Sequence, residues 1–478
     1  MKPRIFLYLF CFLAVFLALV NAEEKVSVYG LELSLKECVY LALENNDTLK
    51  DAYINRKIQK LNFQISEETF FPKIFFSTSG GVSKSTGLDY SFSFNPGGSL
   101  KIPTGGSFSF SWANSMSDAG TDYASSMSLS FSQPLLKGMG IDVATASMTK
   151  ARINEKINIL NLKTTITDTV SSIISTYYSL LKAQRAVIDS EEVFQKAQKT
   201  LKTSQLLLKM GRIAKVDIFQ TEADVANQEL AYVAAKASLE EAQTDLLDEL
   251  ELVSTLNVVV KEELELIEPE NLDFDYLWSI AQNRPAYQIA RLNFEKDKIS
   301  YIVDKNNQLW DLSLSASISN SGSAANYQQA FTESARFLTE GSWNVLLSTS
   351  YDFDNLSEQA TAISIEHTWQ KSQRTLEDAK KALHTEIEAR IREVKAGAIK
   401  LKLATRSREL AEKFVKIEQD KLKQGLTTNF KVIALQKNLK EAREVGLDAK
   451  FAYFNTLVSL DKSLGATLNT WGIEFKEQ

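Results

Sequence analysis

Two histidines, His367 and His384, are the residues of this sequence best suited to acid–base or metal chemistry at neutral pH. They lie 17 residues apart in one tract typical of a helix, a spacing that does not build a shared metal site, and no cluster of Cys or His supports either one. No metalloprotease, nucleophile-elbow or phosphate-loop pattern occurs. The sequence therefore predicts a protein that is not an enzyme and that needs no metal and no cofactor.

The charge balance of the chain excludes a second class of function. Lys and Arg number 54 and Asp and Glu number 60, which gives a net charge of −6. Without a basic excess the chain cannot neutralise many phosphates, so nucleic acid is not expected as a partner. The helical carboxylates, of which Glu240, Glu241 and Glu249 are examples, are interpreted as the solvated face of a coil.

The N-terminus is typical of a secretory signal peptide. Lys2 and Arg4 precede the uncharged run Ile5–Val20, and small residues lead to an expected cleavage after Ala22. An uncleaved anchor is the alternative, although the run is short for a spanning helix. Because no later stretch is apolar enough to span a membrane as a helix, we expect any membrane insertion to use β-strands.

Glycine and proline are absent from Ile141 to Met210, and the tract from Leu356 to Gln424 contains only Gly397. Seventy helical residues span about 105 Å. Such lengths indicate a coiled coil or a tubular assembly. The helices that follow have apolar or small residues at alternating spacings of three and four, which predicts a coiled-coil seam. These seam positions are Ile218, Thr221, Val225, Gln228, Tyr232, Ala235, Leu239, Ala242 and Leu246, and Val432, Leu435, Leu439, Ala442, Gly446, Ala449, Tyr453, Thr456 and Leu460.

Two other regions have a period of two, with aromatic or aliphatic residues alternating with serine. The clearest runs begin at Tyr90, Phe108, Met127, Leu312 and Trp343. A strand with this alternation separates an apolar from a polar environment. We expect turns at Asn95–Gly98 and at Thr104–Gly106, and exposed loops within 80–106 and 116–121.

The chain also repeats itself. Ala42–Asn46 resembles Ile280–Arg284 at an offset of 238, and Gly211 corresponds to Gly425 at an offset of 214. The 24 additional residues of the first copy fall in its strand region. The predicted organisation is a signal peptide 1–22, a first repeat 23–250, a linker or equatorial segment 251–275, a second repeat 276–465 and a C-terminal equatorial tail 466–478. The first repeat contains a helix, a β-hairpin 72–135, a long helix 141–210, a tip 211–217 and a helix 218–250. The second repeat contains a helix, a β-hairpin 310–354, a long helix 356–424, a tip 425–431 and a helix 432–465.

Two hairpins supply four strands, which cannot close a barrel by themselves. Because open strand edges are not tolerated in lipid, we expect copies of the chain to associate, and three copies would make twelve strands. The predicted fold class is a mixed α and β membrane protein, with a trimeric 12-stranded β-barrel continued by a long α-helical coiled-coil barrel.

Four segments together resemble the TolC-like outer membrane efflux protein family. Leu33–Asn46 resembles its opening motif, Gln133–Gly138 its strand-to-helix turn, Gly211–Gln220 its first periplasmic tip, and Gln282–Pro285 the start of its second repeat. The resemblance covers about Leu33 to Gly465. It implies a homotrimer in the outer membrane that extends into the periplasm, contacts outer-membrane lipid, and works with a periplasmic adaptor (membrane fusion) protein and an inner-membrane pump or ABC exporter.

The resemblance also implies functional residues at the tips. Adaptor contacts are expected at Gly211, Arg212, Ile213, Ala214, Gly425, Leu426 and Thr427. In familiar members of the family, acidic residues six and nine positions after the second tip glycine ring the periplasmic entrance. Here those positions are Lys431 and Ala434, whereas Asp217 keeps an acid in the first repeat. Asp217 and Lys431 are the entrance candidates, and a solvated helix residue is the equal alternative for Lys431.

The function implied is a channel that conducts small molecules or proteins to the cell exterior, in multidrug efflux or type I secretion. The main alternative is a secreted coiled-coil surface adhesin or stalk without transport activity. A stalk accounts for the long helices and the secretion signal, whereas it leaves the two-faced strands and the duplication without a role.

Overall fold

The computed structural model describes residues 31–84, 88–117, 122–211, 215–253, 256–261, 271–351, 355–424 and 426–473. The expected signal peptide 1–22 lies outside these ranges. The chain divides into two compact units, and the long helices contribute residues to both. The first unit comprises Met1–Asp47, Val170–Ile267 and Ile399–Asn455, and the second comprises Thr48–Thr169, Glu268–Ala398 and Thr456–Gln478.

The first unit is built from long helices and one small sheet. Its helices are α2 (Leu35–Asn45), α6 (Lys215–Glu249) and parts of α5 (Ala146–Lys209), α11 (Asn355–Lys423) and α12 (Asn429–Leu464). β1 (Leu31–Leu33) pairs in parallel with β6 (Val258–Val260). The buried Tyr177 of α5 donates a hydrogen bond to the carbonyl of Lys261, 2.6 Å away, and so fastens this sheet to the helices.

The predicted seams of α6 and α12 face inward. Every seam position is buried or half-buried, while most residues between them are exposed. Ile218, Leu246, Val432 and Leu460 are among the buried ones. Because the 3-4 spacing returns to one face of a helix, this burial is what coiled-coil packing requires.

Cys38 of α2 is fully buried in the same unit. Loss of hydration disfavours the thiolate and raises the pKa of its thiol to about 12. Cys38 is therefore a packing residue with little reactivity at neutral pH.

The second unit contains the remaining elements. Its helices are α3 (Asp47–Glu67), α4 (Ile141–Ala144), α7 (Phe274–Ala281), α8 (Pro285–Asn307), α9 (Tyr327–Ala335), α10 (Phe337–Glu340), α13 (Thr467–Thr470) and the short 3-10 turn Glu68–Phe70. An ion pair between Arg56 of α3 and Glu155 of α5, with Nη1 and Oε2 2.9 Å apart, ties two of its helices together. Pro285 begins α8 at a position where no helical N–H is needed.

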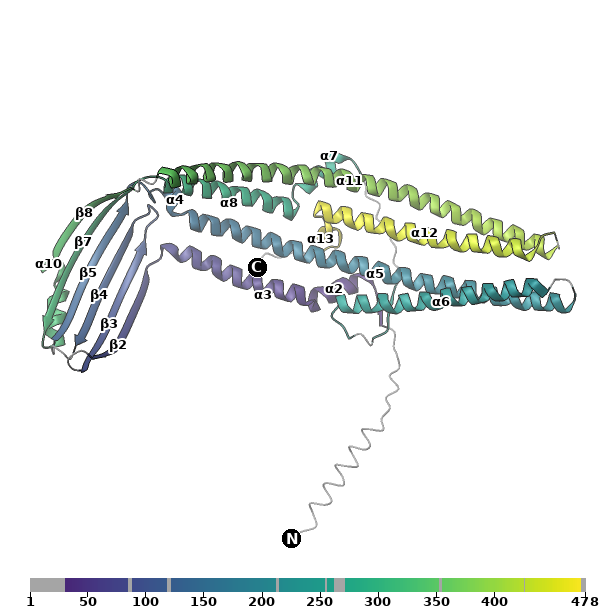
Figure 1. The fold of residues 1–478 in the computed structure, drawn as a ribbon, viewed down its shortest axis with the longest axis horizontal. Coiled ribbons are helices and arrows are strands. Elements are labelled where there is room, and N and C mark those ends of the chain that lie inside the picture. The colour runs from purple at the N-terminus through teal and green to yellow at the C-terminus, as the bar shows by residue number, and fades with distance from the viewer. Residues whose placement is uncertain are drawn as a thin grey trace, which may run out of the picture. The chain divides into compact units, whose positions relative to one another are not determined.

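The second unit also contains one antiparallel sheet of six strands (Figure 1). Its strands, in their spatial order, are β2 (Lys73–Lys84), β3 (Leu88–Lys101), β4 (Ser107–Ser117), β5 (Asp122–Pro134), β7 (Asp311–Ala324) and β8 (Ser342–Ser350). The expectation of four strands per chain is therefore wrong. The region 72–135 forms two successive hairpins where one was predicted, because Lys73–Lys84 and the three alternating runs that follow it each pair as a separate strand.

The expected turn at Asn95–Gly98 is also wrong, because these residues lie inside β3. Pro96 has no N–H to donate, and the ladder to β4 skips Asn95 and Pro96 before it resumes at Gly97. The ring of Phe75 lies against Gly97, where an added Cβ would come within 2.8 Å of the ring. The Pro-Gly pair therefore accommodates an aromatic ring in a strand and does not reverse the chain.

The expected turn at Thr104–Gly106 is present and joins β3 to β4. Gly105 has a φ of 98°, which glycine tolerates best. The turn lies beside the start of the helices, since the N–H of Gly140 donates to the carbonyl of Thr104 over 3.3 Å. It therefore closes the helix-proximal end of the sheet, whereas residues 85–87, which join β2 to β3 in the same predicted region, lie outside the described ranges. The other predicted loop is described only in part, because residues 118–121 lie outside the described ranges.

The sheet has two chemically distinct faces. The register places Phe110, Leu129 and Ile318 in line on one face, with Trp343 of β8 beside Ile318 and Phe108 on the same face two residues along β4. The other face is dominated by serines. Serine pairs hydrogen-bond across neighbouring strands, and they are Ser79–Ser93, Ser109–Ser130, Ser111–Ser128 and Ser313–Ser348. The alternation in the sequence is thus realised in three dimensions.

A polar patch interrupts the apolar face beneath α9. Asn114, Ser125 and Gly322 lie in line on neighbouring strands, and α9 covers them. The hydroxyls of Ser125 and Ser334 are 2.7 Å apart, and an added Cβ on Gly322 would come within 2.4 Å of the Ala330 carbonyl. The connection between β7 and β8 is therefore a packed pair of short helices, α9 and α10, where the sequence suggested a simple hairpin.

Candidate functional site

The first candidate tip is the turn between α5 and α6. The N–H of Gly211 donates to the carbonyl of Leu208 over 2.8 Å, and the φ of Gly211 is 70°. Nothing lies within 4 Å of an added Cβ there, so the requirement for glycine comes from the backbone angle. Arg212, Ile213 and Ala214 lie outside the described residues.

The second candidate tip joins α11 to α12. The N–H of Leu426 reaches back to the carbonyl of Lys421 over 2.9 Å and closes the end of α11. The Leu426 side chain is 71% exposed. Gly425 lies outside the described residues. A large apolar side chain exposed at a chain reversal is a candidate contact for another molecule.

A buried carboxylate stabilises this second tip. Glu418 of α11 is only 7% exposed at its side chain, and the Thr427 hydroxyl donates to its Oε1 over 2.6 Å. The ammonium groups of Lys431 and Lys421 lie 3.4 Å and 3.5 Å from its two carboxylate oxygens. Glu418 therefore connects α11, the turn and the first turn of α12, and we call these four residues the Glu418 cluster.

The Glu418 cluster depends on charge. The hydrogen bond from Thr427, and then the interactions with Lys431 and Lys421, hold the pKa of Glu418 below its ordinary value of 4.5. Because the pKa is lower in the folded protein, the stabilisation is complete above the ordinary pKa and is lost as the pH falls through the lower folded value. At neutral pH the cluster is fully formed.

We expect replacement of Glu418 by Gln to loosen the second tip. The amide keeps the size of the side chain but cannot form the two ion pairs, and it leaves two ammonium groups close to each other. Trypsin should therefore cleave the tip, which contains Lys421 and Lys431, several-fold faster than in the wild type. Peptide mapping of the native protein after timed digestion measures the rates.

The matched control for that variant is Glu409→Gln. Glu409 lies on the same helix in an exposed ion pair with Arg406 at 3.6 Å, and such pairs contribute little to stability. It should leave the cleavage rate unchanged. Equal rates in the two variants would show that the Glu418 cluster does not hold the turn.

The structure bears on the charge that the two entrance candidates would present. Lys431 is not a free ammonium, because it pairs with Glu418. The side chain of Asp217 lies outside what the structure describes. Position 204 of the first repeat corresponds to Glu418 and holds Ser204, so the two tips carry different charges. Glu418 was not predicted from the sequence, because it lies seven residues before Gly425. Its negative charge, opposite in sign to that of Lys431, was the available signal.

Large apolar residues that were not predicted from the sequence lie beside both tips. Met210, Val216 and Phe219 are 66%, 68% and 62% exposed around the first tip, and Phe430 is 63% exposed beside the second. Exposed aromatic and aliphatic residues concentrated at two chain reversals favour a docking surface over simple helix ends.

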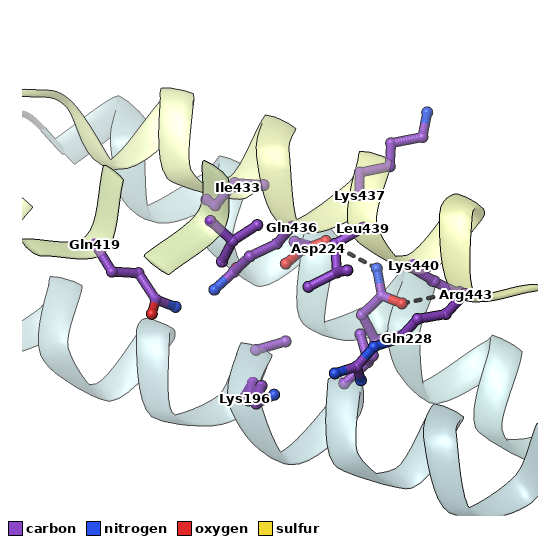
Figure 2. Close-up of a pocket in the computed structure, with 13 residues that line it drawn as sticks. Lys196, Asp224, Gln228, Gln419, Ile433, Gln436, Lys437, Leu439, Lys440 and Arg443 are labelled. Carbon is purple, nitrogen blue, oxygen red and sulfur yellow. Dashed lines mark hydrogen bonds between the residues drawn. The ribbon is translucent and has the colours of Figure 1, made fainter. Parts of the chain in front are cut away.

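Polar side chains fill the space between the helix pairs in the first unit. Figure 2 shows residues of α5, α6, α11 and α12 around a cavity of about 60 Å³, which has room for several waters and for no sizeable ligand. Lys440 Nζ donates to Gln228 Oε1 over 3.1 Å, and Gln228 donates in turn to Asp224. Arg443 forms ion pairs with Glu192 and Glu412 at 3.1 Å and 3.5 Å. The α5–α6 pair and the α11–α12 pair thus contact each other through hydrogen bonds and ion pairs.

Of the two histidines first considered for catalysis, His384 packs against neighbouring side chains. His384 packs 4.5 Å from the ring of Phe274 and lies 3.7 Å from Glu388. Among the described residues, no three His, Cys, Asp or Glu side chains gather in a way that could hold a metal ion. The described helices include none long and apolar enough to cross a membrane.

Comparison with known proteins gives this geometry a context. Residues 38–249 match the model of the family described as Outer membrane efflux protein. The matched segment contains most of α2, the first four strands of the large sheet, α5, the first tip and α6. No curated protein matches the sequence closely enough to serve as a relative.

Solved outer-membrane channels share the fold over nearly the whole chain. The CmeC outer membrane channel of Campylobacter jejuni is 16% identical with a TM-score of 0.63, over 91% of this chain and 86% of that one. The open state of the Neisseria gonorrhoeae MtrE outer membrane channel is 14% identical with a TM-score of 0.65, over 91% and 89%. The outer membrane protein VceC of Vibrio cholerae is 14% identical with a TM-score of 0.67, over 90% and 96%. At these identities the likeness establishes the fold.

Proposed function

We propose that this chain is an efflux channel of the outer membrane, as the match of residues 38–249 to the outer membrane efflux protein family supports, and that three copies of it form one continuous conduit. The six-stranded sheets of the three copies close a barrel in the membrane. Their long helices continue the conduit into the periplasm. The two tips of each chain meet a periplasmic adaptor, which connects the conduit to an inner-membrane pump or ABC exporter.

The observation that carries this proposal is the two-faced sheet with two open edges. Ile74, Phe76 and Trp343 on the apolar face are 88%, 73% and 77% exposed in the single chain, and they lie on the edge strands β2 and β8. In lipid, unpaired edge groups cost several kcal/mol each. Pairing of edges between copies removes this cost, places the apolar face against lipid and encloses the serine face in a water-filled lumen.

The tips supply the proposed contacts with the adaptor. The side chains proposed to touch it are those of Arg212, Ile213, Ala214, Leu426 and Thr427, with Gly211 and Gly425 shaping the turns. Asp217 and Lys431 are proposed to face the entrance. Since Lys431 pairs with Glu418, which also pairs with Lys421, its charge at the entrance is compensated in part.

A secreted stalk or adhesin is the alternative that the sequence left open. It gives no role to a sheet whose one face is apolar and exposed and whose other face is lined with serine. In an efflux channel each face has a matching environment, which is lipid for the apolar face and water for the serine face.

Membrane fractionation combined with a heating test separates these two functions. We expect the protein in the outer-membrane fraction, and we expect an unheated sample to migrate differently from a boiled one, because closed barrels resist detergent until they are heated. A protein released by washing with high salt or carbonate, with the same migration before and after boiling, would favour the stalk. Fractionation of intact cells followed by paired electrophoresis lanes decides between them.

A further inference from the structure

The six strands of the large sheet exceed what the internal duplication requires. β2 follows the first helical segment as β7 follows the second, and β5 leads into α5 as β8 leads into α11. The equivalent strands are therefore β2 and β7, and β5 and β8. The hairpin formed by β3 and β4 has no counterpart in the second repeat, and it accounts for the additional length of the first.

This additional hairpin is fully integrated into the sheet. β2 and β3 pair from Lys73–Ser99 to Lys84–Leu88, and β4 and β5 pair from Ser107–Ser132 to Ser117–Asp122. Its turn is fixed at the helix-proximal end, where Thr104 Oγ1 lies 2.9 Å from Gln133 Oε1. A hairpin folded into the lumen as a plug would leave β2 and β5 to pair with each other, and here β3 and β4 separate them.

The hairpin also keeps the two-faced pattern of its neighbours. Phe110 of β4 stands opposite Leu129 of β5 on the apolar face. Ser111 stands opposite Ser128 on the serine face, and their hydroxyls are 2.8 Å apart. A segment with lipid-compatible residues on one face and serines on the other belongs in a wall between lipid and water.

We infer that the additional hairpin is part of the barrel wall, so that the trimer closes an eighteen-stranded barrel in which β2 of each copy pairs with β8 of the next. This inference rests on the proposed trimer. Six strands from each of three copies make eighteen. Because the number per chain is even, β8 of one copy runs antiparallel to β2 of its neighbour and the sheet continues without a parallel junction.

The width of the pore follows from the strand number. Barrel diameter grows roughly linearly with the number of strands, so eighteen strands give about one and a half times the diameter of twelve. Barrels of about this size enclose an aqueous channel. The outer-membrane part of this conduit therefore admits bulky solutes or extended polypeptides, and the choice of cargo is left to the periplasmic tips and their partners.

Four variants, each with one added cysteine, test this inference in trimers reconstituted in lipid vesicles. Phe110→Cys and Ser111→Cys probe the additional hairpin, and Leu129→Cys and Ser128→Cys are the matched positions on β5. Cys38 can remain, because it is buried with a thiol pKa of about 12. A bimane label reports lipid contact when spin-labelled lipid quenches it, and a charged maleimide reports contact with water.

The expected result is that the two strands behave alike. Labels at positions 110 and 129 should be quenched by lipid, whereas cysteines at 111 and 128 should react with the charged maleimide. If the β5 pair shows this pattern and the β4 pair does not, the additional hairpin lies outside the wall and the inference is wrong, while the channel stands. If the β5 pair also lacks the pattern, the barrel itself is refuted, and the eighteen-stranded form with it.

Discussion

Replacement of Leu129 by Lys should nearly abolish assembled protein in the outer membrane. Leu129 lies on the apolar face of the central strand β5, between Phe110 and Ile318. A lysine at the lipid-facing middle of a strand costs about 2 to 4 kcal/mol per chain. Because three chains assemble together, the cost is incurred three times in each trimer. Quantitative blotting of outer-membrane fractions measures the loss.

The control is one residue away on the same strand. Ser128 belongs to the serine face, where its hydroxyl lies 2.8 Å from that of Ser111. A Ser128→Lys variant should assemble nearly normally, since its ammonium faces the aqueous lumen, and it should shift ion selectivity toward anions. Equal loss in both variants would contradict the assignment of the two faces.

Replacement of one apolar residue at each tip should abolish export without affecting assembly. A double variant, Ile213→Asp with Leu426→Asp, changes both tips at once. Leu426 is 71% exposed and supports no internal core, so trimers should form at the wild-type level. The added carboxylates would have to be buried unpaired against an adaptor, which is strongly unfavourable. Export of the cargo should therefore fall to the level of a deletion strain.

Two further measurements make this prediction specific. Cross-linking between the tips and the adaptor should disappear together with export. The conservative pair Ile213→Val with Leu426→Met keeps the apolar surface and should retain both. Normal export and normal cross-linking in the aspartate variant would show that the tips are turns and nothing more.

The fold class follows from local patterns in the sequence. A tract without glycine from Ile141 to Met210 has few ways to reverse direction, and it contains α5. Alternation of aromatic residues with serine fixes which residues share a face, because side chains of a strand alternate with a period of two. Both patterns are local in the sequence, so they can be interpreted without knowledge of tertiary contacts.

The number of strands could not be read as reliably. The dipeptide Pro96-Gly97 is typical of a turn, yet in β3 the glycine accommodates the ring of Phe75 from the neighbouring strand. Only the pairing partner reveals this role. The error in the count arose because each repeat was expected to hold two strands, although the three alternating runs that begin at Tyr90, Phe108 and Met127 already indicate more than two strands in the first repeat.

The ion pairing at the second tip was the least predictable feature of the candidate site. Lys431 is visible in the sequence as a departure from an acidic pattern, but its partner Glu418 lies on the preceding helix. Whether the two meet depends on the path of the turn between Gln424 and Asn429. Helix periodicity does not specify that path, so the ion pair emerged only from the structure.

The most direct test of the trimeric channel is the mass of the native complex. Protein extracted from the outer membrane in mild detergent and examined by native mass spectrometry should contain three copies of the chain, because one six-stranded sheet cannot close its two edges. Heating should convert this species to single chains with loss of β-structure. A single chain that keeps its full β-sheet spectrum in the same detergent would contradict the account.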